Sequence, residues 1–490
     1  MRIVVDPSNI DDYRKFLAVK SLPSFRCAGR ELSFPDEYAS LVNGEAKKPA
    51  AARKYKPWPG LFDYQRDIAA MAIQKRKFAI FADCGLGKTM MLLEFMRHAA
   101  KVLPTHKRLL IVCPLMVVRQ TLAEAAKFYE GELDIEHVPA AELADWLKGE
   151  GNRLGITNYD ALTDDLKQGC LGCLVLDESS VLKSHYGKWG QVCLNLGAGL
   201  DWKLCLTGTP APNDRIEYAN HAVFLDAFPT INAFLARYFV NRGQTQERWV
   251  LKPHAIGPFY RALSHWSIFL ANPETYGWKD NAGKIPPIIT HIHHVDMTQG
   301  QRDAVLSATG ELFVTSAGGI TKRSKLAQIG KGTKGIASDK PVFIRSLVES
   351  WPTESTIIWC LYNEEQDGIA KMFPDAANID GSTPIGERER LIADFKAGTR
   401  RSLISKPKIL GCGLNLQIAT RQIFSGLQDS YESYYQAVKR SNRVGSTRPL
   451  NVHIPVTEVE VPMIESVLRK ADRVQADTDE QEKLFKAWKR

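Results

Sequence analysis

Short apolar segments alternate with amphipathic helical stretches through most of this chain of 490 residues, and they do so in two separate series. Regular alternation of strand and helix is typical of a parallel sheet covered by helices. The predicted fold class is therefore α/β, with two parallel-sheet lobes in tandem. The segments expected to be strands are 78–81, 109–113, 174–176 and 204–206 in the first lobe, and 356–360, 403–404, 423–424 and 452–454 in the second.

The remaining parts of the chain differ in composition from the lobes. A small accessory unit comes first, followed by a linker rich in Lys, Ala and Pro. Helical stretches rich in aromatic residues separate the lobes, and the last helix places its apolar residues on one face, where we expect it to brace a lobe. The predicted boundaries are 1–43 for the accessory unit, 44–60 for the linker, 61–225 for lobe 1, 226–335 for a helical inter-lobe insertion, 336–460 for lobe 2 and 461–490 for the brace helix.

The charge balance favours a polyanionic partner without requiring one. The formal net charge is +9 and the sequence pI is about 8.9. No apolar run is long enough to cross a membrane, and the chain does not open with a secretory signal. The nine cysteines are scattered, as expected where thiols stay reduced. We therefore expect a soluble, cytoplasmic protein with no membrane partner.

Two groups of potential metal ligands have a simpler interpretation. Cys170 and Cys173 form one close pair, but no second pair completes the four ligands of a zinc site. His291, His293 and His294 lie in a run that alternates with apolar residues, which is typical of a strand that shows its histidines to solvent or to a neighbour. We expect neither group to bind a metal.

A phosphate-binding loop is predicted at residues 82–89, between an apolar strand and a helical stretch. Gly85 and Gly87 let the backbone wrap around phosphates, and the following helix N-terminus adds positive potential. Lys88 is expected to reach the β and γ phosphates of a nucleotide, and the Thr89 hydroxyl to hold Mg²⁺. A Gly-Lys-Thr triplet is common by chance, and this loop starts with alanine, so other motifs are needed.

The strands that follow supply those motifs. Asp177 and Glu178 end one strand, where the first carboxylate is expected to bind Mg²⁺ and the second to act as general base on an attacking water. The alternative is an acidic pair that only caps the next helix, but the earlier loop favours the catalytic interpretation. Thr207 and Thr209 end another strand and could relay between the nucleotide and a bound strand.

The ordered set of motifs resembles the superfamily 2 helicases, specifically the Swi/Snf-type DNA translocases in a compact bacterial or phage version. The resemblance implies RecA-like lobes that use ATP and Mg²⁺. It also implies that Gln65 recognises adenine, and that Pro114, Leu115 and Thr157 hold a nucleic-acid backbone. The motifs are Tyr64-Gln65, Ala82 to Thr89, Cys113-Pro114-Leu115, Thr157-Asn158-Tyr159, Asp177-Glu178-Ser179-Ser180 and Leu206-Thr207-Gly208-Thr209-Pro210. In this chain Asp-Glu-Ser-Ser replaces the family's Asp-Glu-Ala-His, so the histidine with a coupling role in the family is replaced by serine.

The resemblance continues in the second lobe. The segment 436–445 is similar to the family's last motif, in which two arginines approach the γ phosphate. They lie three residues apart and so share one helical face. The implied roles are Arg443 as arginine finger, Arg440 as its companion, Gln436 in coupling, Gly381 and Ser382 in a turn that contacts the nucleic-acid backbone, Gly413 at the nucleotide and Asn415 at the nucleic acid.

The predicted function is ATP hydrolysis between the two lobes, coupled to movement along double-stranded DNA. Because the protein would hold the nucleic acid by its backbone phosphates, the movement would be largely independent of base sequence. One alternative is a helicase that separates DNA or RNA strands. Another, from a different class, is a DNA-binding scaffold with a nucleotide switch and little turnover. We expect a monomeric ATPase stimulated by nucleic acid, in the cytoplasm of a bacterium or a phage-infected cell.

Overall fold

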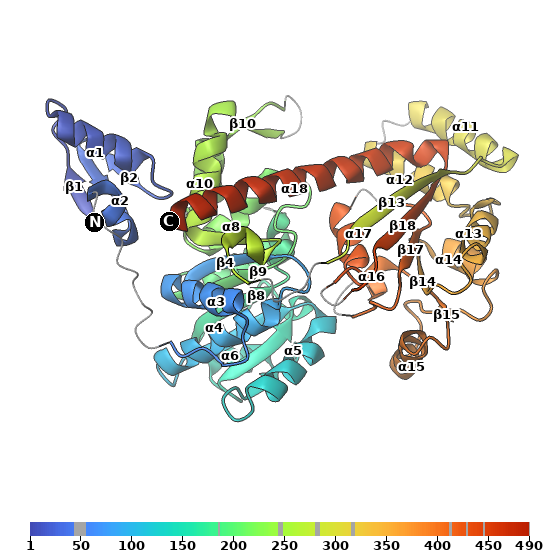
Figure 1. The fold of residues 1–490 in the computed structure, drawn as a ribbon, viewed down its shortest axis with the longest axis horizontal. Helices are drawn as coiled ribbons and strands as arrows, with labels where there is room; N and C mark the ends of the chain where they lie inside the picture. Colours follow the sequence, from blue (N-terminus) through green and yellow to red (C-terminus); the bar gives the residue numbers. More distant parts are fainter. Residues whose placement is uncertain are drawn as a thin grey trace. The chain divides into compact units, whose positions relative to one another are not determined.

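The computed structural model describes residues 1–43, 55–184, 187–243, 248–279, 285–314, 319–410, 414–427, 430–443 and 446–489. The chain forms two compact units (Figure 1). The first unit comprises Met1–Asn281 together with Gln475–Arg490, and the second comprises Ala282–Val474. Most of the predicted linker lies outside the described residues.

The N-terminal residues form a small antiparallel sheet covered by a helix. Its strand order is β1-β3-β2, and the core contains Val19, Leu32 and Phe34. Two contacts join it to the rest of the first unit: the Tyr38 hydroxyl lies 2.6 Å from Nδ1 of His265, and the Arg237 guanidinium stacks over the ring of Phe25. The elements are β1 (Arg2–Val4), α1 (Ile10–Lys20), β2 (Arg26–Ala28), β3 (Glu31–Ser33), η1 (Asp36–Tyr38) and α2 (Ala39–Asn43).

The first unit is built on a sheet of seven parallel strands in the order β12-β4-β9-β8-β5-β7-β6. The predicted parallel sheet is therefore confirmed. Its central strands are buried on both faces, which explains why they read as continuous apolar runs. The strands are β4 (Lys77–Ala82), β5 (Arg108–Cys113), β6 (Ile135–His137), β7 (Leu154–Asn158), β8 (Leu171–Asp177), β9 (Trp202–Leu206) and β12 (Ser267–Leu270).

Helices cover both faces of this sheet. One face carries a continuous core in which Phe81, Leu176 and Cys205 pack with residues of α7, α8 and α10. Cys170, one of the two closely spaced cysteines, donates to the carbonyl of Lys148 at 3.5 Å. The helices are α3 (Asp63–Lys75), α4 (Lys88–Val102), α5 (Leu115–Phe128), α6 (Leu143–Lys148), η2 (Tyr159–Ala161), η3 (Ser179–Lys183), α7 (Lys188–Gly197), η4 (Arg215–Glu217), α8 (Tyr218–Phe224), α9 (Ile231–Tyr238), η5 (Pro253–Ala255), α10 (Ile256–Trp266) and η6 (Pro273–Tyr276).

The predicted helical insertion, 226–335, needs correction because it is only partly helical. Between α9 and α10 it forms an antiparallel hairpin of β10 (Phe239–Asn241) and β11 (Trp249–Leu251). Strand β12 then joins the first sheet beside β4, and β13 (Ile288–His294) joins the second sheet beside β18. Strand β12 has four residues and lies at a sheet edge, so its pattern is weak in sequence, whereas the seven-residue β13 is the strand that the alternating run of histidines predicts.

The second unit contains six parallel strands in the order β13-β18-β17-β14-β16-β15. Alternate residues of β14 divide between two cores: Ile357 and Trp359 pack with α15, α17 and α18, whereas Ile358 packs with α13 and α14. The strands are β14 (Thr356–Trp359), β15 (Ala377–Asn378), β16 (Ser402–Ser405), β17 (Arg421–Phe424) and β18 (Leu450–Val456), and the helices are α11 (Gln299–Val314), α12 (Gly319–Gly330), α13 (Lys340–Glu349), α14 (Asn363–Ala370), α15 (Ile385–Lys396), α16 (Pro407–Leu410), α17 (Tyr431–Val438), η7 (Glu458–Glu460) and α18 (Val461–Lys489).

A buried ionic cluster holds three elements of the second unit together. Glu460 in η7 accepts from Nζ of Lys331 at 2.7 Å and of Lys340 at 2.5 Å. Burial opposes ionisation, yet the two ammonium groups lower the pKa of Glu460 to about 2. The cluster therefore ties the residues that follow α12 and the start of α13 to the start of α18.

His291 and His293 contact the neighbouring strand and His294 is exposed, which agrees with the predicted strand that shows its histidines to solvent or to a neighbour. Nε2 of His291 lies 3.0 Å from Oδ1 of Asn451, and Nε2 of His293 lies 3.0 Å from Nδ1 of His453. Within the described part of the chain, no group of three His, Cys, Asp or Glu side chains is arranged to hold a metal ion. His291 and His293 are thus cross-strand partners of Asn451 and His453.

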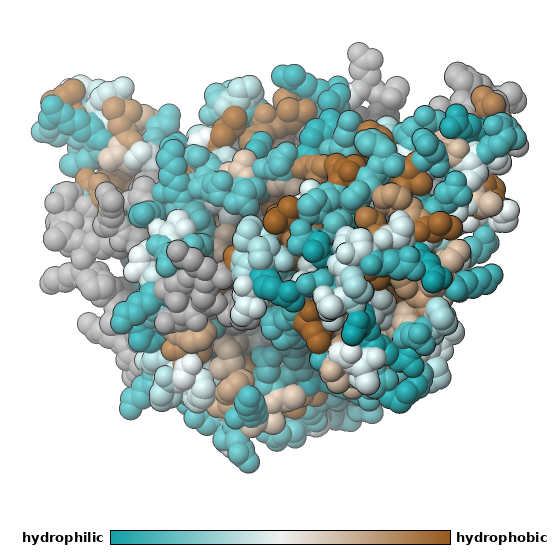
Figure 2. All heavy atoms as spheres, turned by 45° about the vertical axis from the view of Figure 1, so that its right-hand side comes forward, coloured by the Kyte–Doolittle hydropathy of each residue, from teal (hydrophilic) through white to brown (hydrophobic). Residues whose placement is uncertain are grey.

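Hydrophilic residues cover most of the face drawn in Figure 2, and hydrophobic residues form small separate groups on it. Among the helices that the structure describes, none has the length and apolar character that a membrane span requires.

Candidate nucleotide and nucleic-acid site

The predicted phosphate loop lies between the end of β4 and the first turn of α4. Gly85 has φ of 89° and Gly87 has φ of 69°, which are backbone conformations that residues other than glycine rarely adopt. A Cβ atom on Gly87 would come within 2.2 Å of Nε2 of Gln65. Lys88 and Thr89 are the first two residues of α4. The loop therefore has the strand, turn and helix context that phosphate binding requires.

The Lys88 ammonium is held inside this loop. Its Nζ donates to the carbonyl of Ala82 at 3.0 Å. Burial alone would lower the pKa of Lys88, but Cys84, Glu178 and Asp177 raise it above the ordinary value. A permanent positive charge beside the loop suits the phosphates of a nucleotide.

Asp177 and Glu178, at the end of β8, lie close enough to Lys88 for their charges to act on it. Burial first, and then the charge of Glu178, raises the pKa of Asp177 to about 7. Glu178 has φ of 50°, in the left-handed region, and its N–H donates to Oδ1 of Asp177 at 3.0 Å. Non-glycine residues held in this region are strained, and such strain gathers at functional sites. A carboxylate of Asp177 and the hydroxyl of Thr89 are the oxygen ligands that Mg²⁺ prefers, so the residues fit this ion.

Thr207 contacts Glu178 from the end of β9, and Thr209 is bonded to Thr207. The Thr207 hydroxyl donates to Oε2 of Glu178 at 3.2 Å and accepts from the N–H of Thr209 at 3.1 Å. Thr209 is buried, and its own hydroxyl has no hydrogen-bond partner among the described residues. Of the predicted coupling residues, Thr207 is thus in direct contact with the predicted base, and Thr209 is bonded to Thr207.

Gln65 packs against the outside of the loop. It lies on α3 and is 5% exposed. Its Oε1 accepts from the N–H of Phe62 at 3.0 Å, and its Nε2 lies 3.4 Å from the carbonyl of Leu86. These bonds hold the amide beside the phosphate loop, on the nucleotide side of the first unit.

The three residues expected to hold nucleic acid in the first unit differ in accessibility. Pro114 precedes the first turn of α5, and Leu115 is 57% exposed, so both can meet a partner. Thr157 is fully buried, and its hydroxyl donates to the carbonyl of Val138 at 2.8 Å. The expectation for Thr157 is corrected: its side chain serves the packing of β7, because its polar group is already satisfied inside the protein.

In the second unit, Arg443 is more accessible than Arg440. Arg440 is 4% exposed, and its Nε donates to the carbonyl of Gln436 at 3.1 Å. Arg443 is half-buried, and its Nη1 donates to the carbonyl of Leu414 at 3.2 Å. Asn415 is exposed next to that carbonyl, whereas Gly413 lies outside the described residues.

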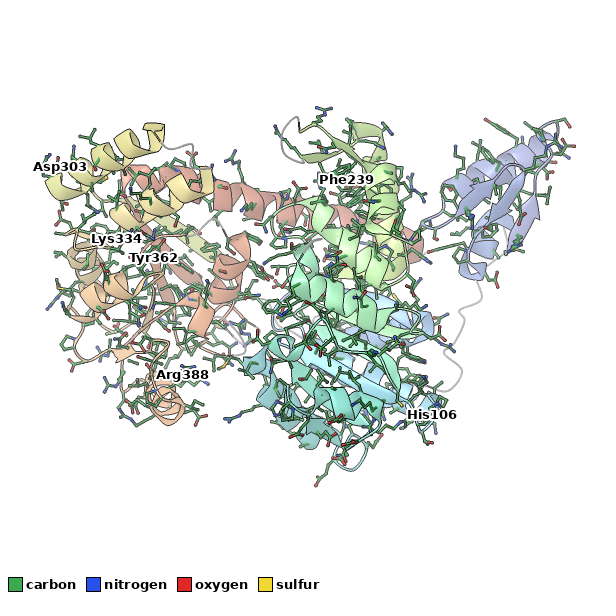
Figure 3. The ribbon with its side chains drawn as sticks, turned by 180° about the vertical axis from the view of Figure 1, so that it is seen from behind. His106, Phe239, Asp303, Lys334, Tyr362 and Arg388 are labelled. Atoms are coloured by element: carbon green, nitrogen blue, oxygen red, sulfur yellow. The ribbon has the colours of Figure 1, made fainter. Side chains whose placement is uncertain are left out.

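Gly381 and Ser382 form an exposed turn before α15, as expected of residues that meet a partner. Asp380 stabilises the turn by accepting from the N–H of Ser382 at 2.8 Å. Arg388, labelled in Figure 3, donates to the carbonyl of Thr383 at 3.3 Å and closes the turn against α15.

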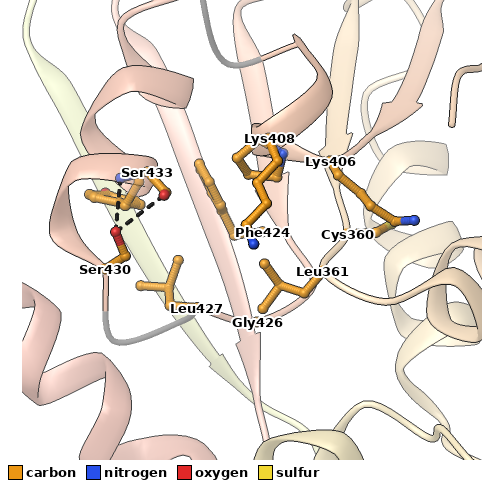
Figure 4. A pocket seen from close by; sticks show the side chains of 11 residues that line it. Cys360, Leu361, Lys406, Lys408, Phe424, Gly426, Leu427, Ser430 and Ser433 are labelled. Carbon is orange, nitrogen blue, oxygen red and sulfur yellow. Dashed lines mark hydrogen bonds between the residues drawn. The ribbon is translucent and has the colours of Figure 1, made fainter. Parts of the chain in front are cut away.

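A small pocket opens at the carboxyl ends of β14, β16 and β17 (Figure 4). Lys406 and Lys408 line it on one side, and Ser430 and Ser433 line it on the other. Parallel strands in open α/β sheets present their binding residues at this edge. The pocket therefore belongs to the functional edge of the second sheet.

Comparison with known protein families shows to which family the chain belongs. The family described as the SNF2-related domain matches residues 64–343, which is more than half of the chain, and the helicase conserved C-terminal domain matches residues 339–445. The chain belongs to the SNF2-related family. It is accordingly an ATP-dependent helicase or translocase of the SNF2 family and a nucleic-acid-dependent ATPase.

Individual relatives of this SNF2-family chain are distant. Protein p41 of Acyrthosiphon pisum secondary endosymbiont phage 1 is 24% identical, over 80% of this chain and 91% of its own. A SWI/SNF-related matrix-associated actin-dependent regulator of chromatin, subfamily A-like protein 1, from Drosophila melanogaster is 23% identical over 80% of this chain, but the match spans only 52% of that protein. Among solved structures, the SWI2/SNF2 ATPase core of Sulfolobus solfataricus in complex with dsDNA is 19% identical, covering 88% of this chain and 97% of its own, with a TM-score of 0.41.

This chain has Asp-Glu-Ser-Ser where the SNF2 family has Asp-Glu-Ala-His. The first of these serines contacts a buried histidine that the sequence analysis did not predict. The Ser179 hydroxyl lies 3.1 Å from Nε2 of His221, which projects from α8. His221 is fully buried, and burial lowers its pKa to about 4, so the imidazole is neutral at ordinary pH. Nothing in the local sequence marks His221, because it lies 42 residues from Ser179 and contacts it only after α8 packs against η3.

Proposed function

We propose that this chain is a motor that moves along double-stranded DNA and uses ATP hydrolysis to do so. The observation that carries the proposal is the convergence of Lys88, Asp177, Glu178 and Thr207 around one phosphate loop. A scaffold that only switches on nucleotide binding would not need a base held against a coupling threonine.

In this mechanism Lys88 binds the nucleotide phosphates, while Thr89 and Asp177 hold Mg²⁺, which supplies charge neutralisation for phosphoryl transfer. Glu178 orients and deprotonates the attacking water. We propose that Gln65 contacts the adenine and that Gly85 and Gly87 present backbone N–H groups to the phosphates. Arg443 would stabilise the charge that develops on the γ phosphate, with Arg440 holding the segment around it in place.

The nucleic-acid track would be contacted through backbone phosphates rather than bases. The candidates are exposed: Leu115 beside Pro114, the turn of Gly381 and Ser382, and Asn415. Movement would then be largely independent of base sequence. Support for duplex DNA as the track comes from the Sulfolobus protein named above, whose ATPase core is described as bound to dsDNA. The phage relative is consistent with a role in a bacterium or an infected cell.

The deciding experiment compares ATPase rates with duplex DNA, single-stranded DNA and RNA of equal length. We expect duplex DNA to stimulate most, and the stimulation to fall as salt screens the phosphates. Equal stimulation by single strands or RNA, together with strand displacement from a labelled fork, would favour the helicase alternative. No stimulation by any nucleic acid would favour the scaffold.

A further inference from the structure

The hairpin of β10 and β11 carries an unusual pair of arginines. Phe239 pairs with Leu251, Val240 with Val250 and Asn241 with Trp249, and the N–H of Arg242 then donates to the carbonyl of Arg248 at 2.8 Å. Arg242 and Arg248 are therefore directly opposite each other, at the end of the ladder. In an antiparallel pair, side chains in this relation lie on the same face.

That face points away from the core. Trp249 and Leu251, on the other face, pack against the main core of the first unit, together with Phe239. Val240, two residues before Arg242 and so on its face, is 37% exposed, and both arginines are exposed. In Figure 1, β10 stands apart from the seven-stranded sheet at the outer end of the first unit. The outward face consists of Val240, Arg242, Arg248 and Val250.

The arrangement costs stability, because like charges directly opposite in a sheet repel each other. Among the described residues, no carboxylate forms an ion pair with Arg242 or Arg248. The surrounding sequence contains few acidic residues that could neutralise them. Between Ala227 and Pro273 the only acidic residue is Glu247, whereas the basic residues are Arg237, Arg242, Arg248, Lys252 and Arg261. This segment of the chain thus has an excess of basic residues, and its hairpin is anchored to the core of the first unit by Phe239, Trp249 and Leu251.

We propose that the outward face of this hairpin is an accessory contact for nucleic-acid phosphates, separate from the ATP site and from the motif residues described above. The inference rests on the proposed function, since it assumes a nucleic-acid track. Two neighbouring guanidinium groups present donors in a fork that matches phosphate oxygens, and a phosphate between them would relieve their repulsion. Because the contact reads no base, it would add affinity rather than sequence preference.

The test measures binding of the full chain to a fluorescent DNA duplex without nucleotide, across a series of salt concentrations. We expect R242A/R248A to weaken binding about tenfold near 0.1 M salt and to reduce the slope of log K against log salt by about two, one for each lost phosphate contact. R242K/R248K should retain most of the slope because it keeps the charge. At saturating DNA, the ATPase rate of R242A/R248A should stay within about twofold of the unaltered protein, because the hairpin is not part of the catalytic machinery.

A matched control removes the same charge from another hairpin: R26A/R30A, two exposed arginines at β2 and the turn that follows it. Equal losses in both double variants would mean that bulk charge, not this face, binds DNA, and would overturn the proposal. An unchanged salt slope in R242A/R248A with intact duplex-stimulated ATPase would also overturn it and leave the proposed function standing. The proposal would also be overturned if poly-glutamate displaced the fluorescent duplex as effectively as unlabelled DNA does, because that result would indicate an acidic protein partner. Because the substitution removes repulsion, R242A/R248A should melt no lower than the unaltered protein.

Discussion

The Thr207 hydroxyl donates a hydrogen bond to Oε2 of Glu178 across 3.2 Å, linking the ends of two adjacent parallel strands, β9 and β8. Because the same hydroxyl accepts from the N–H of Thr209, a shift of the loop after β9 must move the Glu178 carboxylate. The loop after β9 and the proposed base Glu178 are therefore linked through one hydroxyl group.

Replacement of Thr207 with alanine should uncouple nucleic-acid binding from hydrolysis. We expect T207A to lower the DNA-stimulated ATPase rate about tenfold with little change in KM for ATP, because the base loses one orienting hydrogen bond of about 1 to 2 kcal/mol. T207S keeps the hydroxyl and should keep the rate. Full stimulation in T207A would show that the bond has no part in coupling.

Replacement of Glu178 with glutamine should separate ATP binding from turnover. The amide keeps the shape of the side chain but cannot take a proton, so kcat should fall by about 10²- to 10⁴-fold. Binding of a fluorescent ATP analogue, measured by anisotropy, should be nearly unchanged. A variant that hydrolyses ATP at the normal rate would remove the assignment of Glu178 as the base.

The two arginines of the second unit should differ in what they affect. R443A should lower kcat on the order of 10³-fold with a smaller loss of stability than R440A, because the Arg443 side chain is only half-buried. R440A should also lower the melting temperature, since Arg440 is buried and bonded to the carbonyl of Gln436. Arg448, which pairs with Glu354 on the surface, is the control, and R448A should retain activity. Activity in R443A above a tenth of normal would exclude the finger role.

Loss of the Glu460 carboxylate should be strongly destabilising. E460A would leave the buried ammonium groups of Lys331 and Lys340 without their counter-charge, at a cost of about 3 to 5 kcal/mol in the free energy of unfolding. Chemical denaturation measures this directly. Glu458 is exposed in the same turn, so E458A should change stability by no more than about 0.5 kcal/mol. Similar effects of the two substitutions would mean that the cluster contributes nothing.

Acid should destabilise the second unit through its stacked histidines. Burial first, and then the neighbouring His291, His293 and Arg421, lowers the pKa of His453 from 6.5 to about 3. The unfolded chain therefore binds a proton more readily than the folded one, so His453 stabilises the fold above pH 6.5, and this contribution is lost as the pH falls from 6.5 toward 3. H453Q should flatten the decline in melting temperature over this range. An identical pH profile in H453Q and the unaltered protein would refute the prediction.

The local motifs of this protein follow from sequence because each depends on a few neighbouring residues. The loop of Gly85 and Gly87 needs only a strand before it, a helix after it and glycines where φ is positive. The parallel sheets follow similarly from alternating apolar runs and helices. Edge strand β12 escaped prediction, because four residues with one neighbouring strand carry too weak a pattern, whereas the alternating run of histidines did predict β13.

The sequence by itself determined the two α/β lobes, the phosphate loop and the acidic pair at Asp177, since these are encoded by local periodicity and spacing. Only the tertiary structure decided which side chains meet: that Thr207 contacts Glu178, that His221 supports Ser179, that Thr157 is sealed inside, and that two arginines lie side by side on a hairpin. The physical reason is that strand order and helix packing bring together residues tens of positions apart, and no periodicity along the chain specifies those neighbours.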